Sequence, residues 1–245
     1  MDMPVNSSLL TLLVSDPARD IEQTLQLSID ADPDISIAHD SLISGSKTQL
    51  VYRGVTFVMT INRAPQKVSQ WKHIFCNLDP ADIRFGIDIG LGPHVTGGER
   101  VPAIIQALLA LGQRLGASMG AVAAVWHPAR VVSGFDYFSE VISDYLAGGA
   151  FPVLAMVNFR VDDKGAINST GLALLSGQEL HVADNDMEQR EMMRRIVRVV
   201  HDIAINGPIR EAIRLGGLDD KEVLDLDPAA QRGLVKMRVY SIPDA

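Results

Sequence analysis

Cysteine is almost absent from this chain of 245 residues, and aromatic residues are scarce. The single cysteine, Cys76, excludes a disulfide within the chain and a zinc site built from cysteines. Because aromatic residues make up only 5% of the sequence, the core must consist mainly of Val, Ile, Leu, Ala and Met. The low cysteine content fits a reducing compartment.

Long apolar runs are missing as well. No stretch approaches the roughly 18 apolar residues that a membrane-spanning helix needs. The first residues carry no basic region, and the apolar run from Leu9 to Val14 is too short for a signal peptide. We therefore expect a cytoplasmic protein that does not associate with membranes.

Basic residues are in deficit. The chain has 22 Lys and Arg against 30 Asp and Glu, which gives a formal net charge of −8. An acidic chain repels phosphate backbones, so we expect no nucleic-acid partner. Solubility alone accounts for such acidity, and a basic protein partner is the alternative explanation.

The usual catalytic and ligand-binding motifs are also missing. The six histidines form no H-x-H or H-E-x-x-H pair, and no G-x-S-x-G nucleophile turn occurs. The glycine-rich stretch 90–100 lacks the P-loop lysine and the dinucleotide spacing, so a turn before a helix explains it. His73 and Cys76 could share one side of a helix, although a small buried Cys76 is the simpler interpretation. We expect no catalytic residue, no metal and no cofactor.

Apolar periodicity predicts alternating strands and helices in the first half of the chain. The expected elements are a strand at 9–14, a helix after Asp16 and Pro17 that carries Ile21, Leu25 and Ile29, a hairpin that turns near Arg53-Gly54, a strand at 83–91 and a helix at about 99–115. The strand at 83–91 has the clearest pattern. Its apolar residues alternate with Arg84, Gly86, Asp88 and Gly90, which predicts one buried face and one polar face.

The second half continues in the same way. The expected elements are a strand at 122–126, a helix with Phe138, Ile142 and Tyr145 on one side, a strand at 151–161, extended segments joined at Ser176-Gly177, a long helix from the Asp184-Asn185-Asp186 cluster to Asn206, and a last strand at 234–242. Lys236 and Arg238 alternate outward on the last strand. This predicts an edge strand through which two copies of the chain could associate.

The order of these elements favours an α+β fold. Most expected strands alternate in polarity, which is typical of antiparallel or mixed sheets covered by helices rather than of a doubly wound parallel sheet. The β-α-β-β opening suggests two ferredoxin-like halves. Because no linker is apparent, we expect a single α+β domain over residues 1–245.

The stretch AVAAVWHPARVV, residues 121–132, offers one candidate for an enzyme site. His127 directly follows a strand, and functional residues often lie at such positions. A general base needs an orienting partner, and the sequence nominates none, so a polar residue leaving the core is the simpler interpretation. The enzyme hypothesis places a pocket around Trp126, His127 and Arg160, where Arg160 would hold an anion.

An acidic run at residues 219–228 offers the best candidate for docking a basic partner. Its candidate docking residues are Asp219, Asp220, Glu222 and Asp225. A solvated surface is the plain alternative for such a run. Together with the missing catalytic motifs, this run makes a protein-binding module our leading hypothesis.

Over about residues 50–205 the chain resembles a bacterial family known only as a domain of unknown function. The resemblance lies in an A-V-Y-W strand, a P-L-W-V-x-x-R strand and a T-T-G-L…F-G…E-L-E segment. The matching residues are Ala124, Val125, Trp126, Phe138, Pro152, Arg160, Thr170, Gly171, Leu172, Gly177 and Glu179. The family's strand before the middle helix often carries histidines, whereas IRFGIDIG has none. The resemblance implies no established activity, but some members lie near toxin and secretion loci, which implies an immunity or accessory binding role.

Overall fold

The alternating strands and helices form two separate sheets. The computed structural model describes residues 8–16, 20–38, 47–63, 68–183, 187–229 and 233–241. The chain divides into two units, residues 1–149 and 150–245. Over the described ranges the fold is α+β, with six α-helices and two mixed, mostly antiparallel sheets of eight and six strands. The predicted fold class is confirmed to this extent, and the single domain over 1–245 stays a prediction.

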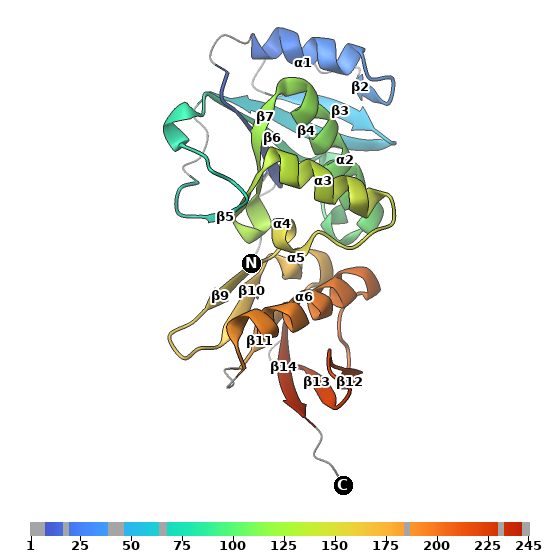
Figure 1. Ribbon diagram of the computed structural model, residues 1–245. Helices are drawn as coiled ribbons and strands as arrows, with labels where there is room; N and C mark the ends of the chain where they lie inside the picture. Colours follow the sequence, from blue (N-terminus) through green and yellow to red (C-terminus); the bar gives the residue numbers. More distant parts are fainter. Residues whose placement is uncertain are drawn as a thin grey trace. The chain divides into compact units, whose positions relative to one another are not determined.

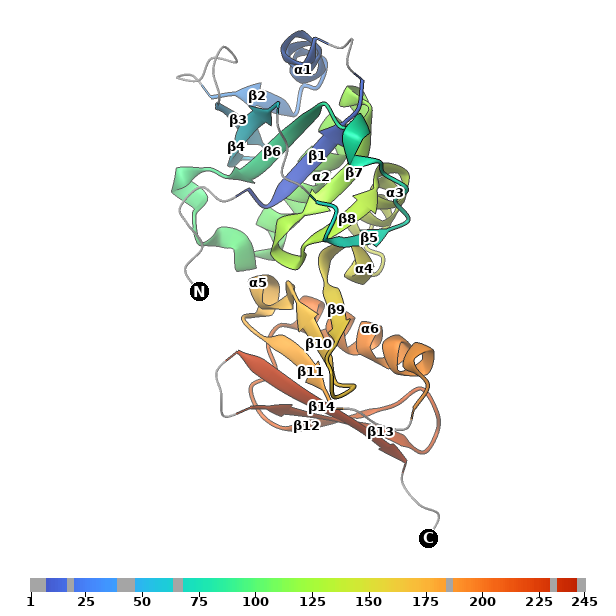
Figure 2. The ribbon, with the colours of Figure 1, turned by 90° about the vertical axis from the view of Figure 1, so that its left-hand side faces the viewer.

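The first unit contains the eight-stranded sheet, in the order β2-β3-β4-β6-β1-β7-β8-β5. Its strands are β1 (Leu10–Val14), β2 (Ile35–Ile37), β3 (Thr48–Tyr52), β4 (Val55–Asn62), β5 (Lys72–Ile74), β6 (Phe85–Leu91), β7 (Ala121–Trp126) and β8 (Val131–Gly134). Its α-helices are α1 (Ile21–Asp30), α2 (Pro102–Met119) and α3 (Phe135–Leu146). Figure 2 shows α2 and α3 on the far side of this sheet.

Strand alternation divides the first sheet into an apolar face and a partly polar face. Leu10, Leu12, Ile87 and Ile89 are buried on the face toward the helices. On the other face, Leu13, Val68, Ala123, Val125 and Val132 form a small core with Trp71, Cys76, Leu78 and Ile83. The segment around β5 therefore covers the β1-β7-β8 part of this second face, as its position in Figure 2 indicates.

The second unit contains the six-stranded sheet, in the order β12-β13-β14-β11-β10-β9. Its strands are β9 (Asn158–Val161), β10 (Ile167–Thr170), β11 (Glu179–Val182), β12 (Ile213–Gly216), β13 (Glu222–Pro228) and β14 (Leu234–Ser241). Its helices are α4 (Val153–Met156), α5 (Leu172–Ser176) and α6 (Gln189–Asn206). Helix α6 buries Ile196, Val199 and Val200, and it covers one face of the sheet in Figure 1.

Several predicted boundaries are wrong in an informative way. The first helix begins at Ile21, because the Asp20 side chain accepts a hydrogen bond from the Gln23 N–H and caps it; Pro17 lies outside the described residues. The run at 151–161 forms α4 before β9, since periodicity does not separate a short buried helix from a strand. His73 lies on β5 and Cys76 in the loop after it, not on a helix.

The last strand is not an edge strand, contrary to the sequence-based prediction. Strand β14 is hydrogen-bonded to β13 on one side and to β11 on the other. Its outward Arg238 and Lys236 lie opposite Asp225 and Asp227 of β13. Their outward position therefore marks one face of an inner strand, opposite acidic residues of β13, rather than an open edge.

Candidate functional site

The end of strand β7 directs its last residues to opposite faces of the sheet. Trp126 pairs with Leu10 in the ladder and is buried on the helix side, with 3% of its surface exposed. Its Nε1 has no hydrogen-bond partner among the described residues. His127 begins a 3-10 turn, and its ring lies on the other face, where its Nε2 is 2.6 Å from the Thr11 Oγ1. The two neighbours therefore do not line the same face.

Arg160, the third residue of the predicted pocket, belongs to the second unit. It lies on the exposed part of β9 and pairs with Asn168 of β10 in the ladder. A pocket that joins Arg160 to Trp126 and His127 stays a prediction.

Two hydrogen bonds through Thr11 connect His127 to Asp88. Thr11 lies between them, and only 4% of its surface is exposed. Because an ionised carboxylate only accepts, the Thr11 hydroxyl donates to Asp88 Oδ1 and accepts from the His127 Nε2–H. The rings of His127 and Trp71 also pack nearly perpendicular to each other, with centroids 5.4 Å apart. These hydrogen bonds give His127 the orienting partners that the sequence alone did not show.

The surroundings of His127 favour its neutral form. Burial lowers the pKa of its ring, and the negative charge of Asp88 acts in the opposite direction. In the neutral ring with the proton on Nε2, Nδ1 is left as an acceptor.

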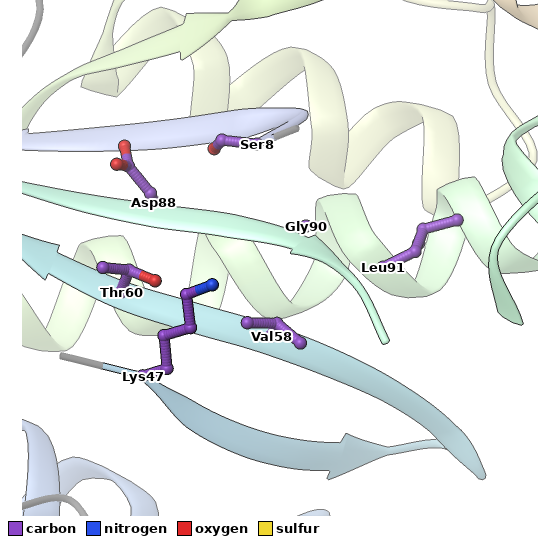
Figure 3. Close-up of a pocket in the computed structure, with 7 residues that line it drawn as sticks. All are labelled: Ser8, Lys47, Val58, Thr60, Asp88, Gly90 and Leu91. Carbon is purple, nitrogen blue, oxygen red and sulfur yellow. The ribbon is translucent and has the colours of Figure 1, made fainter. Parts of the chain in front are cut away.

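A small hollow of about 110 Å³ lies beside Asp88 on the same face of the sheet. Figure 3 shows its lining, in which the Lys47 side chain extends across β4 toward β6. The lining residues are Ser8, Lys47, Val58, Thr60, Asp88, Gly90 and Leu91. Sequence reasoning missed this hollow, although Asp88 on the polar face of a central strand was a signal for it.

A second hollow of about 330 Å³ lies beside an exposed aromatic ring. Phe75 is 77% exposed, and its ring centroid lies 4.8 Å from that of Tyr137 at the start of α3. Phe75, Val122, Asp136 and Tyr137 line the hollow, and we call these four residues the aromatic surface. It combines apolar groups with an acidic side chain on the outside of the first unit.

The backbone holds Phe75 in this outward position. Its φ of 45° lies in the left-handed region, which bulky residues rarely adopt. Its carbonyl oxygen packs against Gly134, where an added Cβ would lie only 2.2 Å away. The neighbouring loop is thus fixed by close contact with β8, and Phe75 is positioned by packing rather than left loose.

Cys76 contributes packing next to this surface. It contacts the small core on the second face of the sheet, and burial raises the pKa of its thiol above the ordinary value. A raised pKa leaves less thiolate, so Cys76 is not activated as a nucleophile. The Nε2 atom of the neighbouring His73 lies 3.2 Å from the Val68 carbonyl oxygen.

The acidic run of the second unit is partly an internal ion-pair network. The Glu222 carboxylate is buried and lies 2.5 Å from Nε of the buried Arg195. Asp219 contacts the same guanidinium at 3.0 Å, and Asp225 lies 3.0 Å from Arg214 Nε. Glu222 therefore faces Arg195 inside the second unit, and docking through Asp219, Asp220, Glu222 and Asp225 stays a prediction.

The residues behind the family resemblance have a structural role at α5. The Glu179 carboxylate accepts hydrogen bonds from the Ser169 hydroxyl and from the N–H groups of Gly171 and Ala173, at 2.5, 2.8 and 3.1 Å. It thereby holds the beginning of α5 against β10 and β11.

Comparison with known proteins adds no assignment. No family model, no curated protein and no solved structure matches the chain. Within the described ranges, no helix is long and apolar enough to cross a membrane, and no three His, Cys, Asp or Glu side chains gather to hold a metal ion.

Proposed function

We propose that this protein is a binding module for another protein and that the aromatic surface is its docking site. The observation that carries this proposal is Phe75, an apolar ring that a left-handed backbone and close contact with Gly134 hold outside the fold. Exposing such a ring forgoes about 2 kcal/mol of burial, and the backbone conformation costs about 1–3 kcal/mol more. Neither the exposed ring nor the left-handed backbone makes the free energy of folding more favourable.

The charges around this surface point to a basic partner segment. Asp136 lines the hollow, and burial together with the nearby negative charge of Glu140 raises the pKa of the Tyr137 phenol. An apolar side chain of the partner would enter the hollow beside Phe75, while lysine or arginine residues next to it would meet Asp136 and Glu140. The net charge of −8 would support this attraction at long range.

The partner segment is expected to be extended. Strand β5 is the last strand in the sheet order, and Phe75 follows it directly. A peptide that adds to the outer edge of β5 would place alternate side chains over the aromatic surface. The family resemblance supports a partner from a toxin or secretion system, for which this chain would act as an immunity or accessory protein.

Selection of random peptides displayed on phage, with the full-length protein as bait, tests the proposal. We expect peptides with an apolar residue flanked by Lys or Arg. A synthetic copy of a selected peptide should bind F75S about thirtyfold more weakly, the effect of losing about 2 kcal/mol at an interface hot spot. L27S is the matched control, because Leu27 is another exposed apolar residue of the same unit.

Two results would overturn the proposal. One is an acidic consensus among the selected peptides. The other is equal binding of the synthetic peptide to the wild-type protein and to F75S, with both proteins folded by circular dichroism.

An enzyme with a site at His127 is the second candidate function. The hydrogen bonds from His127 through Thr11 to Asp88 favour this function, since an oriented histidine is a common general base. The Thr11 hydroxyl is buried and engaged at both ends, so it is a poor nucleophile. Protein binding is therefore the better-supported function.

We also propose that the first unit is built on a ferredoxin-like arrangement. The neighbouring strands β4-β6-β1-β7, together with α1 and α2, follow the chain order β-α-β-β-α-β and are all antiparallel, which supports it. The second sheet has a different order, with a parallel β11-β14 pair whose connection contains α6, β12 and β13. Self-association would then use an outer strand other than β14.

A further inference from the structure

The hollow beside Asp88 has the features of a binding site that the proposed docking function does not use. It lies over the central strands β4 and β6, on the face opposite the helices. Asp88 stands between Gly86 and Gly90 on the same face of β6, and neither glycine has a side chain that would fill the space beside it.

The Asp88 carboxylate is held from behind by the buried Thr11 and the half-buried His127. Thr11 donates to its Oδ1, and His127 donates to Thr11 in turn. Within the described part of the chain no donor reaches the second oxygen, Oδ2. A carboxylate that is fixed by a buried hydroxyl and has one free oxygen is suited to accept from a ligand. A carboxylate that only contacts solvent would not need hydrogen-bonding groups behind it to fix its position.

A cation lies across the hollow from this anion. Lys47 extends over β4 toward β6, as Figure 3 shows. No carboxylate of the described residues lies within 4.0 Å of its ammonium group, so it forms no ion pair with Asp88 there. The Thr60 hydroxyl also lines the hollow, and the Ser8 hydroxyl donates to the Leu10 carbonyl, which leaves the Ser8 oxygen free to accept.

From this geometry we propose that the hollow binds a small zwitterion of the amino-acid class. Its ammonium group would lie at Asp88 and Ser8, and its carboxylate would lie at Lys47 and Thr60. The two protein charges are opposite, separate and unpaired with each other, so a ligand that carries both charges satisfies them together. The volume of about 110 Å³ is sufficient for a small ligand of this class.

Calorimetric titration of the full-length protein tests this site. The probes are glycine, β-alanine and 4-aminobutyrate, which differ in the separation of their charges, with acetate and methylammonium as controls that carry one charge each. We expect one zwitterion to bind more tightly than either control. D88N and K47M should each weaken that binding about tenfold or more, because each removes a charge-assisted contact.

Two further variants separate this inference from the proposed docking function. K72M removes an exposed lysine of the same unit and should leave the binding unchanged. F75S should also bind the zwitterion normally, whether or not it binds a peptide. The proposal is overturned if no zwitterion binds, if acetate or methylammonium binds as well as the zwitterion, or if folded D88N and K47M bind like the wild-type protein.

Discussion

At the scale of single residues, burial and a neighbouring charge act in opposite directions on His127. Burial lowers the pKa of the ring, and Asp88 offsets part of this effect. At His127 the folded protein therefore binds fewer protons than the unfolded chain, in which a histidine titrates near pH 6.5. We expect the free energy of unfolding to fall as the pH decreases below about 6.5, by up to ~1.4 kcal/mol per pH unit from this group. Urea unfolding at pH 7, 6 and 5 measures it.

The variant H127Q isolates the contribution of His127 from that of the other histidines. A glutamine amide can still donate to Thr11, but it does not titrate. The difference in unfolding free energy between the wild-type protein and H127Q should therefore shift in favour of H127Q as the pH falls. Parallel pH profiles for the two proteins would contradict the expected role of His127.

At the scale of elements, an ion pair joins helix α6 to strand β13. Arg195 of α6 and Glu222 of β13 are both buried, and their side chains are 2.5 Å apart. R195M would leave the Glu222 charge buried without its main partner, which costs about 3–5 kcal/mol. Urea unfolding should show this loss, and the double variant R195M/E222L should recover most of it. R194M, at the exposed Arg194, should change stability by less than about 0.5 kcal/mol.

Local patterns predicted the elements whose signals are contained in a few neighbouring residues. The alternation at 83–91 became β6, and the turn at Arg53-Gly54 joins β3 to β4 with both residues at positive φ. The position of β14 in its sheet was mispredicted, because alternating charge reports on a strand's faces and carries no information about its edges. Strand β13 was not predicted, because the apolar Leu224 and Leu226 alternate with acidic residues and the segment was interpreted as an acidic run.

At the scale of the whole molecule, the candidate sites depend on contacts between distant parts of the chain. Thr11, Asp88 and His127 meet only because β1 lies between β6 and β7. Phe75 meets Tyr137 only because β5 pairs with β8, which leads directly into α3. The sequence could single out His127 by its place after a strand. It could not predict the partners of His127, because local periodicity does not determine the order of strands in a sheet.

The division of the chain at Gly149 leads to the last prediction. Each side has its own sheet and its own buried residues, including Leu12 and Ile89 in the first unit and Leu180 and Ile196 in the second. Because a domain needs its own apolar core, we expect fragments 1–149 and 150–245 to fold separately. Each should give dispersed amide NMR signals and a cooperative thermal transition. If fragment 150–245 is unfolded while the full chain unfolds in one step, the six-stranded sheet depends on the first unit, and the expectation of a single domain over residues 1–245 holds instead.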